Sequence, residues 1–485
     1  MSGIGGWART TPDAPALVCN DRTHRFAELE DLQARLASWL RSAGLTSGDR
    51  AGVLADNSTE LLTVTIGCLR AGIVPVPISP LLTPTERHHL LEDSGARVLF
   101  ADRRHECSAP LERVVRFEDL TDRLGDHQPA ELAGVALTRP LHYTSGTTGR
   151  PKGVWLPPAG EREAARRSQS FRRQWGITAS DVHLVCSPLT HSAPHRYALR
   201  TLEAGGCVVV QPRFEARATL EAVERHRATT TFMVPTHLER ILALPEDELR
   251  RYDLSSLRVV AHAGAPIRRV TKERAMELFP PDSVWEFYGS TEGGFTRLSP
   301  AEAGDHPGSV GRPEGAARIE IKSPDDGRIL GTGEVGVVWL RDPGAERFEY
   351  WGDEARTAEA WDHDAFTVGD LGYLDAEGYL YLTGRTGDLI ISGGVNVYPR
   401  EVEATLMAHP EVLEALVYGV HDPEWGQQVR AMIVPVPGAS PDPEGLRAWT
   451  RSRIARHKCP RVIAVVDQLD RTATGKLKRI PSNAG

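Results

Sequence analysis

The segment 143–154 concentrates residues that could bind a polyphosphate. Gly146, Gly149 and Gly153 would let the backbone turn tightly and approach a ligand without a side chain in the way. Neighbouring hydroxyl groups add hydrogen-bond donors to the backbone amides, and two cations add positive charge. These groups come from Thr144, Ser145, Thr147, Thr148, Arg150 and Lys152. The pattern predicts a phosphate-binding loop.

This loop is not a Walker A motif. Its first two glycines stand three residues apart, and Gly153 follows Lys152 where a Walker A loop has the hydroxyl that binds magnesium. A polar surface turn is the alternative interpretation. The density of glycines, hydroxyls and cations in so short a segment favours phosphate binding.

Two later segments add groups that suit a nucleotide. After a strand expected at 285–288, Tyr288 offers a flat face for adenine, Thr291 a hydroxyl for phosphate, and Glu292 a hard oxygen ligand for Mg²⁺. Each alone could be a core aromatic, a capping threonine or a surface glutamate, but their adjacency favours a site. Asp370 could accept both hydrogen bonds from a ribose, with Arg385 supporting it or contacting the α-phosphate.

Four further segments, in order, extend a resemblance to one superfamily over almost the whole chain. They are AHAGAPI at 261–267, EFYGSTEG at 286–293, the stretch 368–398 and RTATGKLKR at 471–479. With the phosphate loop, they resemble the adenylate-forming superfamily, which includes acyl-CoA synthetases, adenylation domains of peptide synthetases and luciferases. One such match would be weak evidence, whereas five in order are specific.

The resemblance implies roles for individual residues. Lys476 would reach across a domain gap to the carboxylate and α-phosphate. Together with His191, Thr291 and Glu292 it forms the expected catalytic set, with Glu292 as the metal ligand. His191 stands in a P-x-x-H segment at the mouth of the substrate pocket; a loop histidine bonded to backbone is the alternative. The expected nucleotide site comprises Thr144, Ser145, Gly146, Thr147, Thr148, Gly149, Lys152, Gly264, Ala265, Pro266, Glu286, Phe287, Tyr288, Gly289, Asp370 and Arg385. The expected substrate pocket comprises His191, Ala193, Tyr197, His262 and Gly289.

Alternating apolar runs and helical spacing predict an α/β fold. Strands are expected at 50–55, 73–78 and 97–101, with helices at 59–71 and 84–93 between them. A second alternating unit at 181–257 has strands at 183–186, 207–211 and 231–234, and further strands are expected at 257–261 and 285–288. We therefore expect a large N-terminal domain of two parallel-sheet α/β subdomains plus a small β-rich subdomain at 308–382. A small mobile α+β lid domain should follow.

The domain boundary is expected after residue 386, giving an adenylate-forming domain at 1–386 and a lid carrying Lys476 at 387–485. In many relatives a Lys or Asp stands at the hinge, where this chain has Gly387 followed by Asp388. Glycine absorbs large changes in φ and ψ, so the hinge itself remains expected.

Composition places the chain among globular enzymes. Its 485 residues are too many for one ordinary core, and 40% are hydrophobic and 25% charged. A net charge of −8 argues against a nucleic-acid or anionic-membrane partner.

No signal peptide or spanning apolar run is apparent, which favours a cytoplasmic enzyme. The six cysteines show neither disulfide nor zinc spacing. A homodimer is the default assembly.

The leading functional hypothesis is an acyl-CoA synthetase that uses ATP, Mg²⁺ and coenzyme A to activate a small-molecule acid through an acyl-AMP. A second hypothesis keeps adenylation but changes the acceptor to a carrier protein or an amine, or the acid to nitrite for aryl-amine diazotisation in secondary metabolism. A third is a non-catalytic nucleotide sensor, which would have no use for Lys476.

Overall fold

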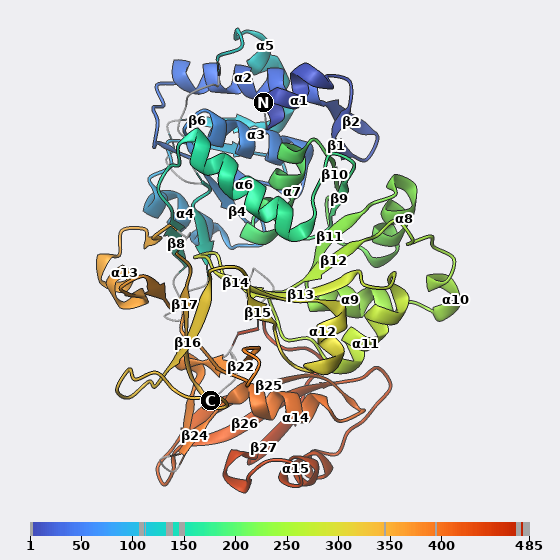
Figure 1. Ribbon diagram of the computed structural model, residues 1–485, viewed down its shortest axis with the longest axis vertical. Coiled ribbons are helices and arrows are strands. Elements are labelled where there is room, and N and C mark those ends of the chain that lie inside the picture. Colours follow the sequence, from blue (N-terminus) through green and yellow to red (C-terminus); the bar gives the residue numbers. More distant parts are fainter. Residues whose placement is uncertain are drawn as a thin grey trace. The chain divides into compact units, whose positions relative to one another are not determined.

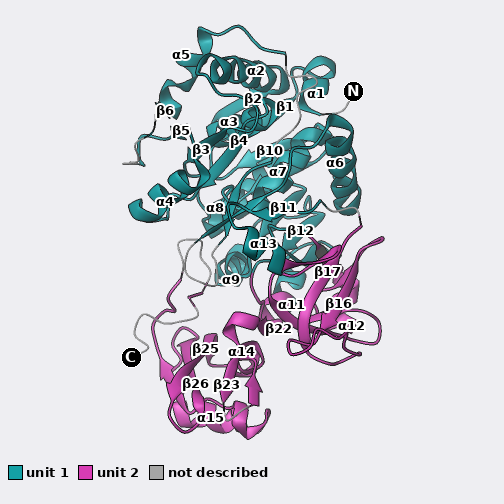
Figure 2. Cartoon of the chain, turned by 90° about the vertical axis from the view of Figure 1, so that its left-hand side faces the viewer, with its two compact units in different colours: residues 1–264, 273–293, 345–359 teal, residues 265–272, 294–344, 360–485 magenta. Residues whose placement is uncertain are grey.

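The computed structural model describes residues 3–105, 111, 113–131, 139–144, 151–343, 346–392, 395–471 and 477–478. The chain forms two compact units (Figure 2). The first comprises residues 1–264, 273–293 and 345–359, and the second comprises residues 265–272, 294–344 and 360–485.

The first unit contains a parallel sheet with strand order β4-β3-β5-β6. Strands β3, β4 and β5 are almost wholly buried apolar runs, as expected for a parallel sheet covered by helices. Helix α4 begins with a Thr83 capping box and ends at Gly95 with φ 62°. The bounds are β3 Arg50–Leu54, α3 Thr59–Arg70, β4 Val74–Ile78, α4 Pro84–Ser94, β5 Val98–Ala101 and β6 Arg113–Arg116.

The part of a second sheet that belongs to the first unit has the order β13-β12-β11-β9-β10-β1-β2, parallel except at the β1/β2 pair (Figure 1). Parallel strands end at one edge of a sheet, where open α/β sheets bind ligands. The chain leaves β9, β12 and β13 at that edge, six residues before His191 and two residues before Gly264 and Thr291. The strands are β1 Pro15–Cys19, β2 Arg22–Arg25, β9 Val182–Val185, β10 Cys207–Val210, β11 Thr230–Met233, β12 Val259–His262 and β13 Val284–Gly289.

Helices complete the first unit, together with a small antiparallel sheet of β7 (His142–Thr144), β8 (Lys152–Trp155) and β18 (Glu349–Tyr350). The α2/α3 pair packs beneath the N-terminal segment, and α7 packs on β9 and β10. In sequence, α11 and α13 each have residues in both units. The helices are α1 Ile4–Thr10, α2 Phe26–Ser42, η1 Phe117–Asp119, α5 Leu120–Gly125, α6 Glu161–Trp175, α7 Ser192–Ala204, α8 Ala216–His226, α9 Pro235–Leu242, α10 Glu246–Leu249, α11 Arg269–Leu278 and α13 Glu354–Ala360.

The second unit is richer in antiparallel strands. One sheet has the order β19-β20-β17-β21-β22, with β16 paired to β17. Its elements, with the short pieces before it, are β14 Phe295–Leu298, α12 Pro300–Asp305, β15 Arg312–Pro313, β16 Arg318–Lys322, β17 Gly336–Arg341, β19 Trp361–Asp362, β20 Ala365–Phe366, β21 Asp370–Leu374 and β22 Leu380–Arg385.

A further sheet forms the C-terminal region of this unit, with order β24-β23-β26-β25 and β27 beside β26. A separate apolar core joins it to α14 and α15 and includes Val402, Leu406, Ala431 and Leu446. The bounds are η2 Thr386–Asp388, β23 Ile390–Ser392, β24 Val395–Val397, α14 Pro399–Met407, β25 Val412–Asp422, β26 Gly426–Pro435, α15 Pro443–Arg451, η3 Arg456–Lys458 and β27 Val462–Val465.

This architecture confirms the predicted fold class: two parallel-sheet α/β regions, a β-rich region and a C-terminal α+β region. The sequence did not predict helix α6 or the return of N-terminal strand β1 to the second sheet beside β10. The expected domain boundary at 386/387 falls inside the second compact unit; it stays a prediction.

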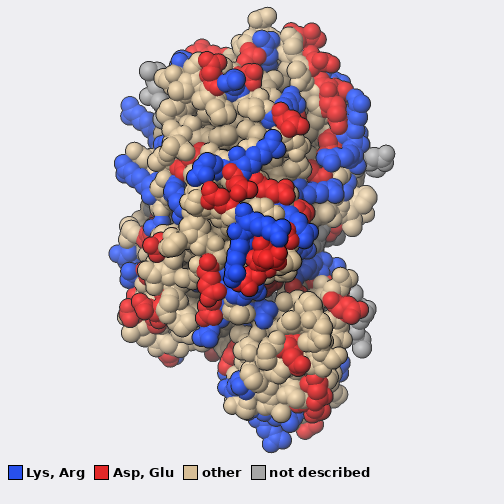
Figure 3. Space-filling model, turned by 90° about the vertical axis from the view of Figure 1, so that its right-hand side faces the viewer, with Lys and Arg blue, Asp and Glu red and all other residues tan. Residues whose placement is uncertain are grey.

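The surface carries charges of both signs. On the face shown in Figure 3, Lys and Arg side chains are interspersed with Asp and Glu. Surface ion pairs on α8 and α10 and beside them include Arg217–Glu248, Arg227–Asp253 and Arg251–Asp247. Within the described segments, no helix is long and apolar enough to cross a membrane.

Candidate functional site

The two ends of the predicted phosphate loop lie opposite each other in an antiparallel hairpin. Thr144 at the end of β7 pairs with Lys152 at the start of β8. The residues between them, Ser145, Gly146, Thr147, Thr148 and Gly149 among them, lie outside the described residues, so their roles stay predictions. The hairpin does show that the loop starts and finishes at one place. Thr144 Oγ1 is buried there without a hydrogen-bond partner among the residues described, which leaves it able to bond a ligand.

Lys152 and Glu292, 140 positions apart in the sequence, meet beside this hairpin. The Nζ of Lys152 lies 3.5 Å from Oε1 of Glu292, and the Glu292 side chain is only 5% exposed. The hydroxyl of Tyr350, from β18, donates a hydrogen bond of 3.0 Å to the same oxygen. The ammonium of Lys152 also lies 3.8 Å from the centre of the Tyr350 ring. Of the three residues, the sequence predicted only Lys152 and Glu292.

The environment of Glu292 fits a hard divalent cation. A buried carboxylate needs compensating charge, and here Lys152 supplies it. Both contacts described above reach Oε1, and Oε2 is the oxygen that a metal ion could take. Carboxylate oxygens are the ligands that Mg²⁺ prefers, usually one or two per ion with phosphates and water completing the shell. A single buried carboxylate beside a phosphate loop is consistent with that pattern.

Gly153 stands where the hairpin packs closely against its neighbours. A Cβ built at this position would lie 3.0 Å from Cβ of Trp351, 3.1 Å from Cδ1 of Leu141 and 3.3 Å from Cζ of Tyr143. The backbone N–H of Trp351 also donates to the carbonyl of Gly153 at 2.9 Å. The glycine therefore lets β18 approach β8.

The segment after β9 lies next to the segment after β13. Ser192 Oγ at the start of α7 and Thr291 Oγ1 are 3.2 Å apart, so the P-x-x-H segment lies beside the Thr291-Glu292 pair. His191 occupies the N-cap position of α7 and, like Ala193, is partly exposed. This arrangement supports a role for His191 at the site but does not test it.

Two further histidines lie behind this segment, and both are neutral at pH 7. Burial, with His195 nearby, lowers the pKa of His142 to about 3. Burial, with Arg200 and Arg196 nearby, lowers the pKa of His195 to about 4. The Nδ1 of His142 lies 3.1 Å from the carbonyl oxygen of Thr190, so that nitrogen carries the proton.

The remaining substrate-pocket candidates differ in exposure. His262 is fully buried at the end of β12, and Tyr197 is 2% exposed within a cluster of rings. The Tyr197 ring lies 5.1 Å from Phe171, 5.3 Å from Trp175 and 5.9 Å from Phe232, centroid to centroid. Gly289 ends β13 and is exposed. Tyr197 is thus part of a packed aromatic layer, and its contact with a substrate stays a prediction.

Strand β13 directs its residues to opposite faces. Phe287 belongs to the aromatic layer, 5.6 Å from Trp175 and 5.8 Å from Phe232. Glu286 and Tyr288 therefore face the other side, Glu286 buried and Tyr288 half-buried. Gly264 has φ 90°, a conformation that favours glycine. Ala265 and Pro266 follow it in the second unit.

The ribose candidates lie in the second unit. Asp370 and Arg385 face each other across β21 and β22, and Nε of Arg385 donates to Oδ1 of Asp370 at 2.8 Å. Gly387 and Asp388 form the short η2 turn directly after β22. Lys476 lies outside the described residues. Arg471 and Leu477 on either side of that gap form an antiparallel bridge, so the segment that carries it begins and ends at one place.

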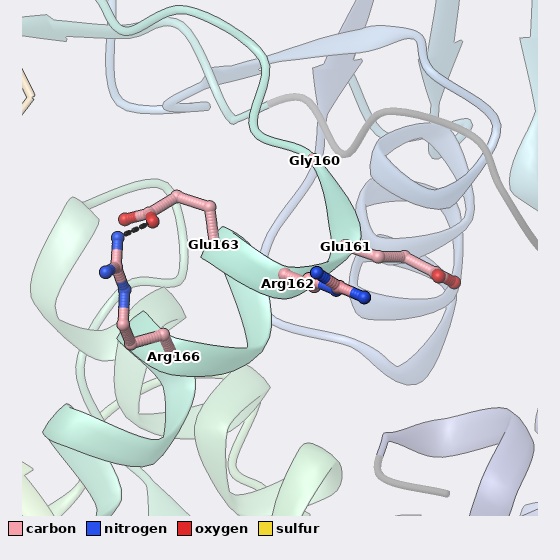
Figure 4. Close-up of a pocket in the computed structure, with 5 residues that line it drawn as sticks. All are labelled: Gly160, Glu161, Arg162, Glu163 and Arg166. Carbon is pink, nitrogen blue, oxygen red and sulfur yellow. Dashed lines mark hydrogen bonds and ion pairs between the residues drawn. The ribbon is translucent and has the colours of Figure 1, made fainter.

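Two other features do not form functional sites. A surface hollow at the start of α6 is lined by Gly160, Glu161, Arg162, Glu163 and Arg166, all from one segment, with Glu163 paired to Arg166 (Figure 4). A group of potential metal ligands, Asp56, Asp102 and His105, is neutralised by arginines: Arg104 lies 3.0 Å from Asp102, and Arg213 lies 3.0 Å from Asp56.

The hairpin that flanks the predicted phosphate loop, a buried carboxylate beside it and an edge where parallel strands end are typical of a nucleotide-dependent enzyme of the α/β class. Comparison with known proteins gives its family. The AMP-binding enzyme family matches residues 6–348, and the AMP-binding enzyme C-terminal domain matches residues 401–476. The chain belongs to this adenylate-forming family and is an ATP-dependent, AMP-forming ligase.

Similar proteins extend along the whole chain. A feruloyl-CoA synthase from Amycolatopsis is 35% identical, covering 98% of this chain and 97% of that protein. An indoleacetate–CoA ligase from Aromatoleum aromaticum is 33% identical, covering 96% and 94%. Among solved structures, o-succinylbenzoate coenzyme A synthetase from Bacillus subtilis with its acyl-adenylate is similar with TM-score 0.86 and 31% identity over 99% of this chain and 97% of that one.

Proposed function

We propose that this ligase joins a carboxylic acid to coenzyme A in two steps. The acid first attacks the α-phosphate of ATP to give an acyl-AMP and pyrophosphate, and the thiol of coenzyme A then displaces AMP. The observation that carries the proposal is the Lys152–Glu292 pair beside the phosphate hairpin, in a chain whose full-length relatives include CoA ligases. The same synthetase from Bacillus subtilis is known in complex with ATP and magnesium ion, with TM-score 0.84 and 30% identity over 98% of each chain.

The chemical difficulty is that a carboxylate is a poor electrophile, since its leaving group would be oxide. Forming a mixed anhydride with AMP solves this, and positioning with charge neutralisation supplies most of the catalysis. Lys152 and the loop before it would hold the β- and γ-phosphates, while Asp370 and Arg385 would bind the ribose. Mg²⁺, held by Glu292, would offset the charge of the departing pyrophosphate.

In the second step, the thiol of coenzyme A needs the place beside the acyl group that a cationic side chain occupies during adenylation. We propose that Lys476 clamps the carboxylate and α-phosphate oxygens during adenylation. A lid comprising 387–485 would then turn about Gly387 and Asp388, withdrawing Lys476 and admitting coenzyme A. His191, Ala193, Tyr197, His262 and Gly289 would line the acid pocket. The protein would act in the cytoplasm as a homodimer, without a nucleic-acid or membrane partner.

Other acceptors deserve a direct test because similar proteins use them. A fatty acid–[acyl-carrier-protein] ligase from Streptomyces coeruleorubidus is 32% identical over 97% of this chain. The structure of an amide bond synthetase from Marinactinospora thermotolerans is similar with TM-score 0.82 and 28% identity over 98% of each chain. A carrier protein or an amine would therefore be the second candidate for an acceptor.

Pyrophosphate release measured across a panel of acids identifies the reaction. The panel contains aryl, arylalkanoic, short-chain and long-chain acids and nitrite, each with and without coenzyme A. We expect release with at least one carboxylic acid and acyl-CoA formation when coenzyme A is present. Release followed by amide formation would replace coenzyme A by an amine, and release with nitrite alone would replace the acid. ATP binding without turnover on any acid would support the nucleotide sensor.

Lys476→Ala separates the two half-reactions. If Lys476 acts only in adenylation, this variant should lose acid-dependent ATP–pyrophosphate exchange by at least about 100-fold while still forming the thioester from preformed acyl-AMP and coenzyme A. Lys478→Ala, two residues further along the same segment, is the matched control. Full adenylation by the Lys476 variant would show that the lid assignment is wrong.

A further inference from the structure

We infer that Tyr350 is a positioning residue of the nucleotide site: its hydroxyl holds the Glu292 carboxylate in place for the metal ion, and its ring holds the Lys152 ammonium. The inference rests on the proposed use of ATP. Tyr350 is not expected to touch the reacting atoms. It acts by fixing two charged groups that come from distant parts of the chain.

The hydroxyl of Tyr350 fixes one oxygen of Glu292. Its hydrogen bond to Oε1 is 3.0 Å long, and Tyr350 and Glu292 are only 4% and 6% exposed. A donor to a charged carboxylate in such a place makes a stronger bond than a neutral pair would, because water competes little. With Oε1 held, rotation of the carboxylate is restricted and Oε2 points in a defined direction. Such outer partners typically matter for metal affinity by about 10–100-fold.

The ring of Tyr350 fixes Lys152 independently of the hydroxyl. The Nζ of Lys152 lies 3.8 Å from the ring centroid, within the range of a cation–π interaction. Holding a lysine side chain in one place costs rotamer entropy, and the contact with the ring offsets part of that cost. The ring therefore keeps the ammonium at the start of β8, both while it pairs with Glu292 and when phosphates attract it.

Tyr350 is itself held rigidly. Its partner across β18 and β8 is Val154, and its backbone N–H donates to Thr357 Oγ1 at 2.9 Å. Its ring makes an edge contact with Phe348, 5.3 Å between centroids. The next residue, Trp351, is bonded to the Gly153 carbonyl. A side chain locked in this way can orient the groups that it touches.

The structure thus gives the two parts of one side chain different functions, and two substitutions separate them. Tyr350→Phe removes the hydroxyl and keeps the ring, whereas Tyr350→Leu removes both. Tyr379→Phe is a matched control, because Tyr379 is also buried and donates a 2.8 Å hydrogen bond to a carboxylate, that of Glu302, outside the site.

The readout is ligand-induced stabilisation, which requires no knowledge of the acid. Thermal unfolding of the full chain is followed with ATP plus EDTA and with ATP plus increasing Mg²⁺. In Tyr350→Phe we expect the Mg²⁺ concentration for half-maximal extra stabilisation to rise by about 10-fold, with ATP binding in EDTA unchanged. In Tyr350→Leu we expect ATP binding in EDTA to weaken as well. Tyr379→Phe should match the wild-type protein in both measurements.

A double substitution tests whether the hydroxyl acts through Glu292. In a Glu292→Gln background, Tyr350→Phe should no longer change the Mg²⁺ response, because the group that it positions has lost its charge. This comparison also holds if Tyr350→Phe lowers the stability of the ligand-free protein, since each response is measured against its own baseline.

The possible results distinguish the role of Tyr350 from the proposed use of ATP. An unchanged Mg²⁺ response in Tyr350→Phe would overturn this inference and leave the proposed function standing. Failure of the wild-type protein to bind ATP at all would overturn both. Equal losses in EDTA and in Mg²⁺ for Tyr350→Phe would show a purely structural role and also overturn the inference.

Discussion

Burial keeps four of the buried histidines of the first unit neutral. It lowers the pKa values of His142 and His183 to about 3 and those of His195 and His237 to about 4. His183 also bonds Thr230 Oγ1 through Nδ1 at 2.9 Å and stacks on Tyr197. Protonating any of these imidazoles would place a charge in the protein interior, so the folded state favours their neutral form.

This predicts a stability that falls in mild acid. A histidine titrates near pH 6.5 in the unfolded chain and near pH 3–4 here, so its contribution is complete above pH 6.5 and is lost progressively as the pH falls toward 4. Each such histidine steepens the loss by at most about 1.4 kcal/mol per pH unit. The thermal unfolding midpoint measured from pH 8 to pH 4 should decline accordingly.

His183→Asn should flatten that decline even if it lowers stability at pH 8. The control is His363→Asn, whose side chain is 90% exposed. Equal slopes for the His183 variant and the wild-type protein would contradict the assignment of the acid sensitivity to buried imidazoles.

The sequence identified Lys152 and Glu292 because their types and neighbours suit phosphate and metal binding. It did not identify Tyr350, since nothing in the local sequence EYWGD distinguishes a positioning tyrosine from a core aromatic. Its function depends on two partners, one nearly 200 and one 58 residues away. The pairing of β18 with β8 brings Tyr350 to Lys152, and the segment after β13 brings Glu292 to both.

At the scale of elements, the hairpin of β7 and β8 that flanks the predicted phosphate loop is held by strand β18 and helix α4. β7 and β8 form the hairpin, and β18 pairs with β8. Helix α4 anchors both ends of this small sheet through Asp93, which accepts a 2.5 Å hydrogen bond from the Tyr143 hydroxyl and, through its carbonyl, one of 2.9 Å from the Trp351 indole. These contacts give a glycine-rich loop a fixed base.

Gly153→Ala should disturb this base more than its size suggests. The added methyl group would press on Trp351, Leu141 and Tyr143 at 3.0–3.3 Å, and overpacking of this kind costs about 1–3 kcal/mol. We expect a lower unfolding midpoint and weaker ATP binding, measured in parallel. Gly125→Ala, where a Cβ would meet nothing within 4 Å, should change neither. Unchanged ATP binding in the Gly153 variant would show that the loop does not depend on close packing of β18.

Most strands and helices were predictable because buried parallel strands are short apolar runs and helices carry caps. The expected strand at 50–55 is β3, and the expected helix at 84–93 is α4. Helix α6 was missed since its sequence, EREAARRSQSFRRQW, is too polar for an apolar stripe to stand out. Pairings between distant segments, such as β1 with β10, leave no periodic signal within either segment.

At the scale of the whole molecule, the proposed two-step reaction requires a chain that can change its conformation after residue 386. Arg385 is fixed by its bond to Asp370, and Thr386 N–H donates to the Gly369 carbonyl at 2.8 Å. Gly387 and Asp388 then form a single short turn before β23 begins at Ile390. Motion is therefore expected to concentrate in these two residues.

Gly387→Pro should separate the half-reactions by restricting that turn. Proline fixes φ near about −65° and restricts the residue before it. We expect thioester formation to slow by at least about 10-fold with adenylation largely retained, because the restricted turn would impede the movement of the lid between the two steps. Gly387→Ala should have a smaller effect of the same kind. If both half-reactions slow equally in the proline variant, the hinge lies elsewhere.

The pairing of β18 with β8 also has a consequence for biosynthesis. The hairpin that bears Lys152 leaves the ribosome nearly two hundred residues before Tyr350 does. Both parallel sheets of the first unit can assemble from residues 15–289, so a nascent chain can acquire most of its core early. The part of the proposed nucleotide site formed by Lys152 and Glu292, however, stays unfinished until the segment 346–359 emerges and docks, and contacts so distant in sequence form late. The nascent chain can therefore fold most of its core before it can bind ATP.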